Sequence, residues 1–470
     1  MKIFKAKQLC IVLFIMAVAL SQCFGDVNLP NIFGDNMVLQ GDMKIPVWGT
    51  SAAGEKITVI LNGKTVKTTA DQDGRWMVKL GKMKPGGPYE MRVTGNNIIV
   101  LRNVKIGEVW LCSGQSNMWW PVERLHDIPG DVAPADNPDI RLFSVWSPEH
   151  DSFGKTPEWV QCDTETVREF SAAAYFFGRY LQQELKVPVG LIHCSMGGSI
   201  PEAWMTRKNL ISNPEFKPIV TSWDSITTVY PDAMARFNQY LSDLKKAKAD
   251  GTQLPDAPTF EFVPKPLRIY MRYPQIVYGA QLKPLAPYGI KGVIWYQGES
   301  SAARSYQYRD LFPAMISEWR EFWDQGNFPF LYVQLANYNG GSAQESIPEL
   351  REAQLMALSV PNTGMAVTVD IGDNDNVHAN NKWDVGYRLA LLAFDKVYGR
   401  NLLSSGPIYT SMKITGNTIR LKFKHKGEGL VAGGNESLKG FVIAGKDRKF
   451  YNAKAQIEGD EVVVSSSNVS

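Results

Sequence analysis

The sequence predicts an α/β protein whose central part is built on a parallel sheet and is flanked by β regions at both ends. Short apolar stretches that end in polar residues recur through the middle of the chain, and such runs are typical of buried parallel strands. Segments with apolar residues at helical spacing lie between them, and this alternation favours a parallel sheet. Before about residue 106 and after about residue 404, short strands separated by turn residues predominate.

The N-terminal segment, residues 1–25, is predicted to be a signal peptide. Three lysines precede an apolar run from 9 to 20, and small or polar residues follow up to Gly25. The run is too short to span a bilayer comfortably, and cleavage before Asp26 is preferred. A lipid anchor on Cys23 is the less favoured alternative, because glutamine precedes this cysteine. We therefore expect an exported protein, periplasmic or extracellular.

Composition and charge limit the classes of partner. The 470 residues, 44% hydrophobic and 21% charged, suffice for two or three globular domains. Removing the signal peptide takes away three lysines and no acid, so the formal charge falls from +3 to about zero. We expect no nucleic-acid partner. Cysteine and histidine do not cluster at ligand spacing, so neither a metal nor an essential disulfide is expected.

The first folded region, residues 26–105, is predicted to be a β-sandwich. Five short strands alternate with turn residues, at 37–40, 45–49, 56–61, 75–80 and 89–94. Asn62-Gly63 is a good hairpin turn, because both residues accept positive φ angles. A structural sandwich is favoured over a carbohydrate-binding module, since the sequence shows no planar aromatic platform.

The apolar stretch 108–112 is followed closely by Ser116, a candidate nucleophile. Ser113-Gly114 breaks the predicted strand, so Ser116 is expected where a strand turns into a loop or helix. Backbone N–H groups at such a turn can stabilise an oxyanion, which makes it a suitable place for a nucleophile. The alternative is an ordinary turn, because Gly, Ser and Asn are common turn formers.

The next elements are expected to complete a strand-helix-strand unit. Residues 121–165 are predicted to be irregular loops over the site. A helix begins after the N-cap Ser171 and stops before Pro188. The strand 189–194 ends in a glycine turn whose N–H groups can face a ligand. Ser195 in that turn is a rival nucleophile, but the Gly-x-Ser-x-Gly pattern is not met.

The rest of the chain continues this alternation. Residues 206–265 are predicted to be an insertion with a solvated lysine-rich helix. The remaining elements are strands from 292, 330 and 364, helices at 309–325, up to 359 and at 384–398, and a C-terminal β region, 405–470.

Three motifs together resemble a known family. They are Gly114-Gln115-Ser116-Asn117-Met118, Gln297-Gly298-Glu299-Ser300 and Asp375-x-x-His378. The set is similar to the sialate O-acetylesterases, a branch of the SGNH hydrolases. The resemblance implies a three-layer SGNH-hydrolase (flavodoxin-like) domain over residues 106–404, with accessory β-sandwich regions at both ends. Because the family continues further, it also suggests that the C-terminal region is truncated.

The motifs supply the groups that serine catalysis needs. A serine hydroxyl requires a base, which is in turn held by an acid. Only His378, of the five histidines, follows a strand end within an acidic loop. Asp375, three residues earlier, can reach the imidazole after one short turn. Asp373 could substitute, and the choice of Asp375 rests on the resemblance.

The resemblance also implies the oxyanion donors. These are the N–H groups of Ser116 and Gly198 and the side-chain amide of Gln297. Asn117 is expected to shape the loop that presents Ser116. Glu299 is expected to hold the Gln297 loop, since no second carboxylate is evident that would make it the acid of a glycosidase. Met196 and Ala379 stand where the family usually has Trp and Pro.

We therefore expect a serine esterase that removes acetyl groups from sugars through an acetyl-Ser116 intermediate, with O-acetylated sialic acid as the first choice of substrate. No cofactor is expected, and the partner is an O-acetylated sugar or glycan. The alternatives are an acetylxylan or other polysaccharide deacetylase, and a non-catalytic carbohydrate-binding protein. The sequence indicates no oligomeric state.

Overall fold

The computed structural model describes residues 25–145, 156–229, 274–339, 346–433 and 438–469, with scattered positions between 235 and 272. The first 24 residues of the predicted signal peptide, with Cys23, lie outside the described residues, as does most of the predicted insertion beyond residue 229. The described part of the insertion contains α4 (Arg207–Ser212) and α5 (Lys217–Val229). No helix among the described residues has the length and apolarity needed to span a membrane.

The central sheet is parallel from β13 to β8, in the order β13-β12-β11-β7-β10-β8-β9, and only the edge strand β9 in this path pairs antiparallel. Every residue of β10 to β13 is buried, which explains their continuous apolar sequences. The predicted α/β class and parallel sheet are confirmed. The strands are β7 (Ile98–Gly114), β8 (Asn137–Ser144), β9 (Trp159–Cys162), β10 (Val189–Ser195), β11 (Gly292–Tyr296), β12 (Phe330–Val333) and β13 (Thr363–Ala366).

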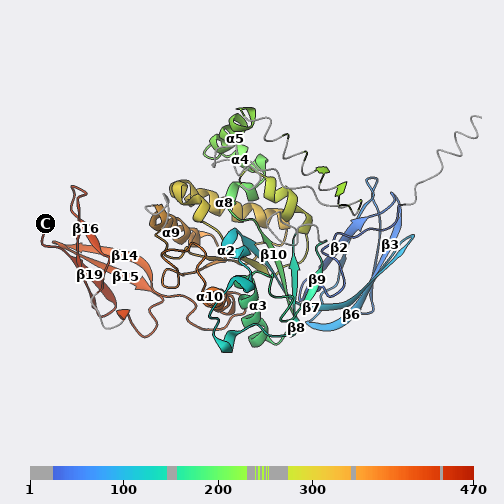
Figure 1. Cartoon of the computed structure of the whole chain (residues 1–470), viewed down its shortest axis with the longest axis horizontal. Coiled ribbons are helices and arrows are strands. Elements are labelled where there is room, and N and C mark those ends of the chain that lie inside the picture. The colour runs from blue at the N-terminus through green and yellow to red at the C-terminus, as the bar shows by residue number, and fades with distance from the viewer. Residues whose placement is uncertain are drawn as a thin grey trace, which may run out of the picture.

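Helices cover both faces of this sheet (Figure 1). Trp110 of β7 contacts Phe177 of α3 (Ala172–Leu185), with ring centroids 5.0 Å apart. Trp295 of β11 pairs in register with Ser113, on the other face from Trp110, and its ring lies 5.5 Å from Trp319. Trp319 belongs to α8 (Ser305–Trp323), which packs beside α9 (Ile347–Met356), whereas α10 (Lys382–Lys396) packs beside α3.

The predicted start of α3 is confirmed. The Oγ atom of Ser171 accepts a hydrogen bond from the backbone N–H of Ala174 at 3.2 Å, as an N-cap residue does. The helix ends at Leu185, where Lys186 adopts a left-handed conformation with φ of 56°.

The prediction that residues 121–165 are irregular was wrong for two segments. Residues 137–144 form β8, which pairs with β10 and buries Ile140, Leu142 and Phe143. Residues 159–162 form β9 at the sheet edge. The prolines that suggested loops lie at or beyond the ends of these strands, where they remove no necessary hydrogen bond.

Most of the N-terminal strands belong to the same sheet as the central strands, whereas β2 (Ile45–Thr50) and β5 (Arg75–Leu80) form a separate two-stranded sheet. Strand β7 pairs with β6 between Ile98 and Ile106, with β10 from Glu108 and with β11 from Trp110, so it crosses the predicted domain boundary. The Asn62-Gly63 hairpin is confirmed, with φ angles of 46° and 74°. The strand β4, which was not predicted, is polar and largely exposed. The strands are β1 (Val38–Gln40), β2 (Ile45–Thr50), β3 (Lys56–Leu61), β4 (Lys64–Thr69), β5 (Arg75–Leu80) and β6 (Gly86–Thr94).

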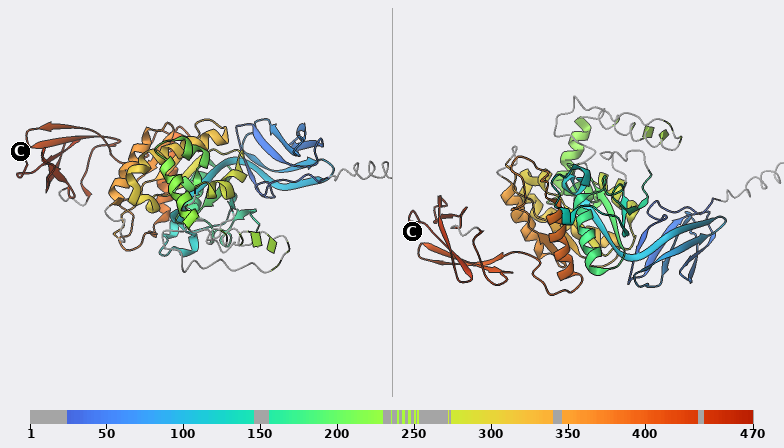
Figure 2. Two further views of the ribbon diagram at one scale, coloured as in Figure 1. Left: turned by 90° about the horizontal axis from the view of Figure 1, so that it is seen from above. Right: turned by 60° about the horizontal axis from the view of Figure 1, so that its bottom comes forward.

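The C-terminal strands form a separate small unit with its own core of Ile443, Ala455, Val462 and Val464. Its four-stranded sheet has the order β14-β15-β19-β18, and β16 pairs with β17. Figures 1 and 2 show the N-terminal and C-terminal strands at opposite ends of the central domain. The strands are β14 (Ile408–Thr415), β15 (Thr418–Lys424), β16 (Val442–Ala444), β17 (Phe450–Asn452), β18 (Lys454–Glu458) and β19 (Glu461–Ser465).

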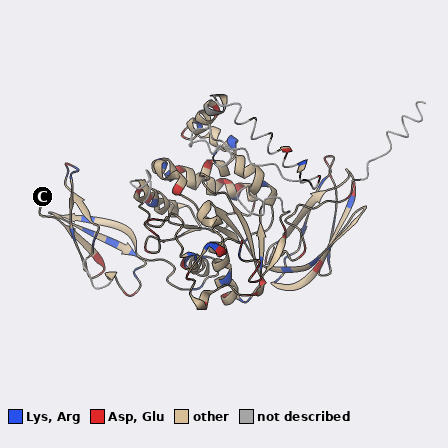
Figure 3. Ribbon diagram, in the orientation of Figure 1, with Lys and Arg blue, Asp and Glu red and all other residues tan. Residues whose placement is uncertain are grey.

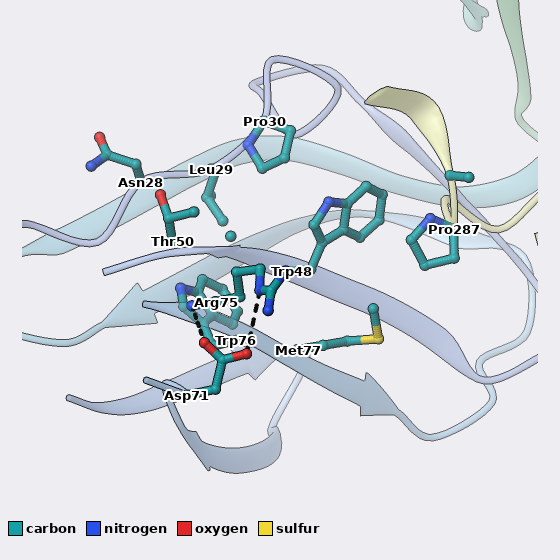
Figure 4. Close-up of a pocket in the computed structure, with 12 residues that line it drawn as sticks. Asn28, Leu29, Pro30, Trp48, Thr50, Asp71, Arg75, Trp76, Met77 and Pro287 are labelled. Carbon is teal, nitrogen blue, oxygen red and sulfur yellow. Dashed lines mark hydrogen bonds and ion pairs between the residues drawn. The ribbon is translucent and has the colours of Figure 1, made fainter. Parts of the chain in front are cut away.

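A pocket of about 690 Å³ opens between the N-terminal strands and the segment that precedes β11 (Figure 4). Trp48, Met77 and Pro287 line it. Because Pro287 comes before β11, this pocket lies at the amino end of the parallel strands. Charged residues of both signs are interspersed over the ribbon (Figure 3).

Candidate active site

The candidate site lies at the carboxyl end of the central strands, where ligand sites of parallel sheets are found. Strand β7 lies between β10 and β11 and ends at Gly114, followed by α2 (Ser116–Trp119). A Cβ atom on Gly114 would lie 2.1 Å from the carbonyl oxygen of Tyr296, and the φ angle of Gly114 is +142°. Only glycine fits there, and the close approach brings the loop of Ser116 against the loop that follows β11.

Ser116 and His378 are brought together. The Oγ atom of Ser116 lies 2.8 Å from Nε2 of His378, although 262 positions separate the two residues. The His378 ring also stacks on Trp120, with centroids 4.3 Å apart and planes 18° apart. Ser116 is partly exposed, so its hydroxyl is accessible while it lies within hydrogen-bond distance of a possible base.

The surroundings of His378 favour its neutral form. Burial, together with the positive charges of Lys382 and Arg124, lowers the pKa of His378 to about 4. A neutral imidazole can accept the Ser116 proton at any pH well above this value. The arrangement therefore suits a general base.

The acidic loop does not bring a carboxylate to His378. The Asp375 side chain is exposed, and within the described residues it makes no hydrogen bond or ion pair. The Oδ1 atom of Asp373 accepts the backbone N–H groups of Asp375 and Asn376, at 2.9 and 3.2 Å, and so shapes the turn. The roles of Asp375 and Asp373 as orienting acids stay predictions.

Two of the expected oxyanion donors are available. No backbone hydrogen bond in the described ranges uses the N–H group of Ser116 or Gly198. Gly198 has a φ angle of +68°, which glycine adopts readily, and its carbonyl accepts a bond from Nε of Arg272 at 3.1 Å.

The Gln297 amide is engaged elsewhere. Its Nε2 donates to the carbonyl oxygen of Ser199 and to Oγ of Ser301, both at 3.1 Å, and its Oε1 accepts from the Tyr308 hydroxyl at 3.1 Å. The side chain is fully buried. It therefore ties the loops after β10 and β11 together, and its donation to an oxyanion stays a prediction that requires one of these bonds to be exchanged.

A buried polar network lies beneath the serine. The side-chain amide of Asn117 donates to Glu299 and, at 2.9 Å, to the carbonyl oxygen of Val377. The Nζ atom of Lys382 donates to Oδ1 of Asn117 and to the carbonyl oxygen of Ala379, each at 2.7 Å. Asn117 thus links the loops that carry Ser116, Glu299 and His378.

The buried charges of Lys382 and Glu299 shift each other's pKa. Burial lowers the pKa of Lys382 to about 7, against the opposing effect of the Glu299 carboxylate. Burial raises the pKa of Glu299, and the hydrogen bond from Asn117 opposes that shift. Among the described residues, the Oε2 atom of Glu299 is buried without a hydrogen-bond partner.

Sequence reasoning missed the roles of Lys382, Trp120 and Arg124. Lys382 is completely buried, Trp120 stacks on the base, and the guanidinium of Arg124 lies over the rings of Trp119 and Trp120. The only signals were the spacing of Lys382 from His378 and the aromatic pair after Ser116. Neither signal indicates burial or a ring contact.

The rival serine is inaccessible. Ser195 Oγ lies 2.6 Å from Nε2 of His193, but their exposed fractions are only 2% and 0%. This pair therefore belongs to the interior of the sheet. Within the described ranges, no group of three or more His, Cys, Asp or Glu side chains is placed to hold a metal ion. Cys112, Cys162 and Cys194 are buried free thiols.

Comparison with known proteins gives consistent results. A family described as carbohydrate esterase, sialic acid-specific acetylesterase, matches residues 106–249 and 268–394. The sialate O-acetylesterase of Mus musculus is 30% identical over 427 residues, covering 79% of this chain and 74% of that protein. The Homo sapiens sialate O-acetylesterase is 29% identical over 418 residues, covering 80% and 72%. A crystal structure of a carbohydrate acetylesterase from Xanthomonas citri superimposes with a TM-score of 0.77 at 34% identity, covering 95% of this chain and 92% of that chain.

Proposed function

Because the chain belongs to the sialic acid-specific acetylesterase family of carbohydrate esterases, we propose that it removes O-acetyl groups from sialic acid through an acetyl-Ser116 intermediate. Membership of this family makes the protein a carboxylic ester hydrolase that deacetylates sugars. The serine mechanism and the sialic acid substrate are our proposal. The observation that carries it is the 2.8 Å contact between Ser116 Oγ and His378 Nε2.

In the first half-reaction, His378 Nε2 accepts the hydroxyl proton while Ser116 Oγ attacks the acetyl carbonyl carbon. The oxygen of the tetrahedral intermediate receives hydrogen bonds from the N–H groups of Ser116 and Gly198. When the intermediate collapses, the carbon–oxygen bond to the sugar breaks. The imidazolium then gives its proton to the departing sugar oxygen, which leaves as a hydroxyl.

In the second half-reaction, His378 takes a proton from water, whose oxygen attacks the acetyl-Ser116 carbonyl. Collapse breaks the bond to Oγ, the proton returns to Ser116, and acetate is released. The Trp120 ring keeps the imidazole plane fixed through both steps. The neutral state of His378 at physiological pH supports its use as a base twice in each cycle.

We propose in addition a fold for the central domain and a cellular location for the protein. The central domain has helices on both faces of its parallel sheet and a serine loop at the carboxyl end of β7, which supports an SGNH-hydrolase fold. The N-terminal and C-terminal strands would be accessory β-sandwiches. Export to the periplasm or the outside of the cell follows from the N-terminal sequence alone.

Hydrolysis of p-nitrophenyl acetate tests the serine mechanism. Ser116→Ala is expected to lower kcat by at least about 10³-fold, because the nucleophile is removed. Ser195→Ala, which alters the buried serine, is the matched control and should retain turnover. Equal rates for the wild type and Ser116→Ala would overturn the mechanism.

A second assay tests the substrate. Acetate release is measured from O-acetylated sialic acid and from acetylated xylan at equal ester concentrations. We expect the larger kcat/KM on sialic acid. Activity on xylan alone would replace the proposed substrate with the polysaccharide alternative and leave the serine mechanism in place.

A further inference from the structure

An exposed cation stands beside the catalytic base on an aromatic surface. The Cζ atom of Arg124 lies 4.6 Å from the centroid of the Trp119 ring and 5.1 Å from that of Trp120. Trp120 in turn stacks on His378 with centroids 4.3 Å apart. The distance from Arg124 Cζ to the centroid of the His378 ring is therefore at most the sum of the 5.1 Å and 4.3 Å distances. A sugar ring with its substituents can span this distance.

The backbone around Arg124 is fixed relative to the site. The N–H of Val122 donates to the carbonyl oxygen of Phe170, and that of Glu123 donates to the carbonyl oxygen of Arg168, each at 3.0 Å. Two further bonds join the next turn to the loop of His378. The His126 N–H donates to Asn380 Oδ1 at 3.0 Å, and Asn380 Nδ2 donates to the carbonyl oxygen of His126 at 2.6 Å.

No neighbouring acid in the part of the chain that the structure describes neutralises the charge of Arg124. The adjacent Glu123 pairs with Arg168 at 3.9 Å, and within the described residues Arg124 forms no ion pair. The two charged side chains that shift the pKa of His378, Lys382 and Arg124, are both cations. Lys382 is buried and hydrogen-bonded, so Arg124 is the one that can contact a ligand.

We propose that Arg124 binds the carboxylate of an acidic sugar and thereby selects acetylated sugars that carry one. The planar guanidinium forms two parallel hydrogen bonds to a carboxylate, and stacking on Trp119 limits the side-chain freedom lost on binding. Its contact with Trp120 places the acid group of the substrate beside the base. A neutral xylan backbone offers no such group. This inference rests on the proposed function and names Arg124 as the residue that recognises the carboxylate of the substrate.

The test compares kcat/KM for O-acetylated sialic acid as the free acid and as its methyl ester, which has the same acetyl group without the charge. The wild type should prefer the free acid by about tenfold, because one charge-assisted interaction is lost in the ester. Arg124→Gln should reduce this ratio to near one. The ratio is internal to each variant, so incomplete folding of a variant does not change it.

Arg168→Gln is the matched control, because it removes a neighbouring exposed guanidinium and should keep the wild-type ratio. Equal use of the acid and the ester by the wild type, or a ratio retained in Arg124→Gln, would overturn the role of Arg124. Ser116-dependent hydrolysis of p-nitrophenyl acetate separates the two proposals. If it is present while the ratio is one, only the carboxylate site fails; if it is absent, the proposed function fails.

Discussion

The amine of Lys382 donates to Oδ1 of Asn117 at a distance of 2.7 Å, from the first residue of α10. The same Nζ donates to the carbonyl oxygen of Ala379 at 2.7 Å. One buried side chain therefore holds the residue after Ser116 and the residue after His378. We therefore predict that Lys382 is a positioning residue for the proposed mechanism, because it holds both loops that set the distance between Ser116 and His378.

Lys382→Met should lower kcat by roughly 10- to 100-fold with little change in KM, because a small misplacement of the base is costly. Loss of the positive charge should also raise the pKa of His378 and move the acid limb of the kcat/KM profile to higher pH. Steady-state kinetics across pH measure both effects. Lys396→Met, at the exposed end of the same helix, is the control. An unchanged kcat and acid limb would contradict this role.

The pH dependence of the wild type follows from His378. In the proposed mechanism His378 acts as a base only when it is neutral, and its pKa is lowered to about 4. The kcat/KM should therefore stay constant from neutral pH down to about pH 5 and fall about tenfold per unit below pH 4. A profile with a buffer-independent limb near pH 6.5 would show that His378 titrates like an exposed histidine.

Asp375 can be tested by comparing two pH profiles. If its carboxylate reaches His378 Nδ1 only when substrate is bound, it raises the pKa of His378 in the complex. The acid limb of kcat should then lie at higher pH than that of kcat/KM. Asp375→Asn should remove this difference and lower kcat by about 10²-fold or more.

Asp373→Asn is the control for that experiment. An asparagine Oδ1 can still accept the N–H groups that hold the turn, so the loop keeps its shape while the charge is lost. We expect nearly wild-type kcat. The opposite result, a large loss in Asp373→Asn and none in Asp375→Asn, would assign the acid to Asp373.

Gly114→Ala should destabilise the fold by more than about 3 kcal/mol, since the new Cβ adds a 2.1 Å clash with a backbone oxygen to an unfavourable φ angle. Gly63→Ala is the matched control, because its φ is +74° but no atom lies within 4 Å of the new Cβ. It should cost about 1–2 kcal/mol. Urea unfolding followed by tryptophan fluorescence gives both values, and equal values would contradict the clash.

The sequence predicted the strands before Ser116 and Gln297 because buried parallel strands have continuous apolar runs, whereas the strand expected to lead to His378 ends at Ala366, twelve residues earlier. It missed β8 because Pro138 is the second residue of this strand and the buried Arg141 interrupts its apolar residues. The partnership of Ser116 with His378 came from a resemblance of motifs, since no local pattern connects positions 262 apart. Burial of Lys382 could not be predicted, because lysine is usually exposed and only the assembled loops supply its acceptors.

Strand β7 runs without a break from the N-terminal strands into the central sheet, and this limits where the chain can be truncated. One strand pairs with β6 through Ile106 and with the catalytic sheet from Glu108, so its two halves lose order together. Trimming the protein to a minimal catalytic fragment at residue 106 would leave the nucleophile's strand without the backbone partners that anchor its first half. We therefore expect the N-terminal strands and the catalytic sheet to melt as a single cooperative unit, while the C-terminal strands, with their separate core, can melt independently.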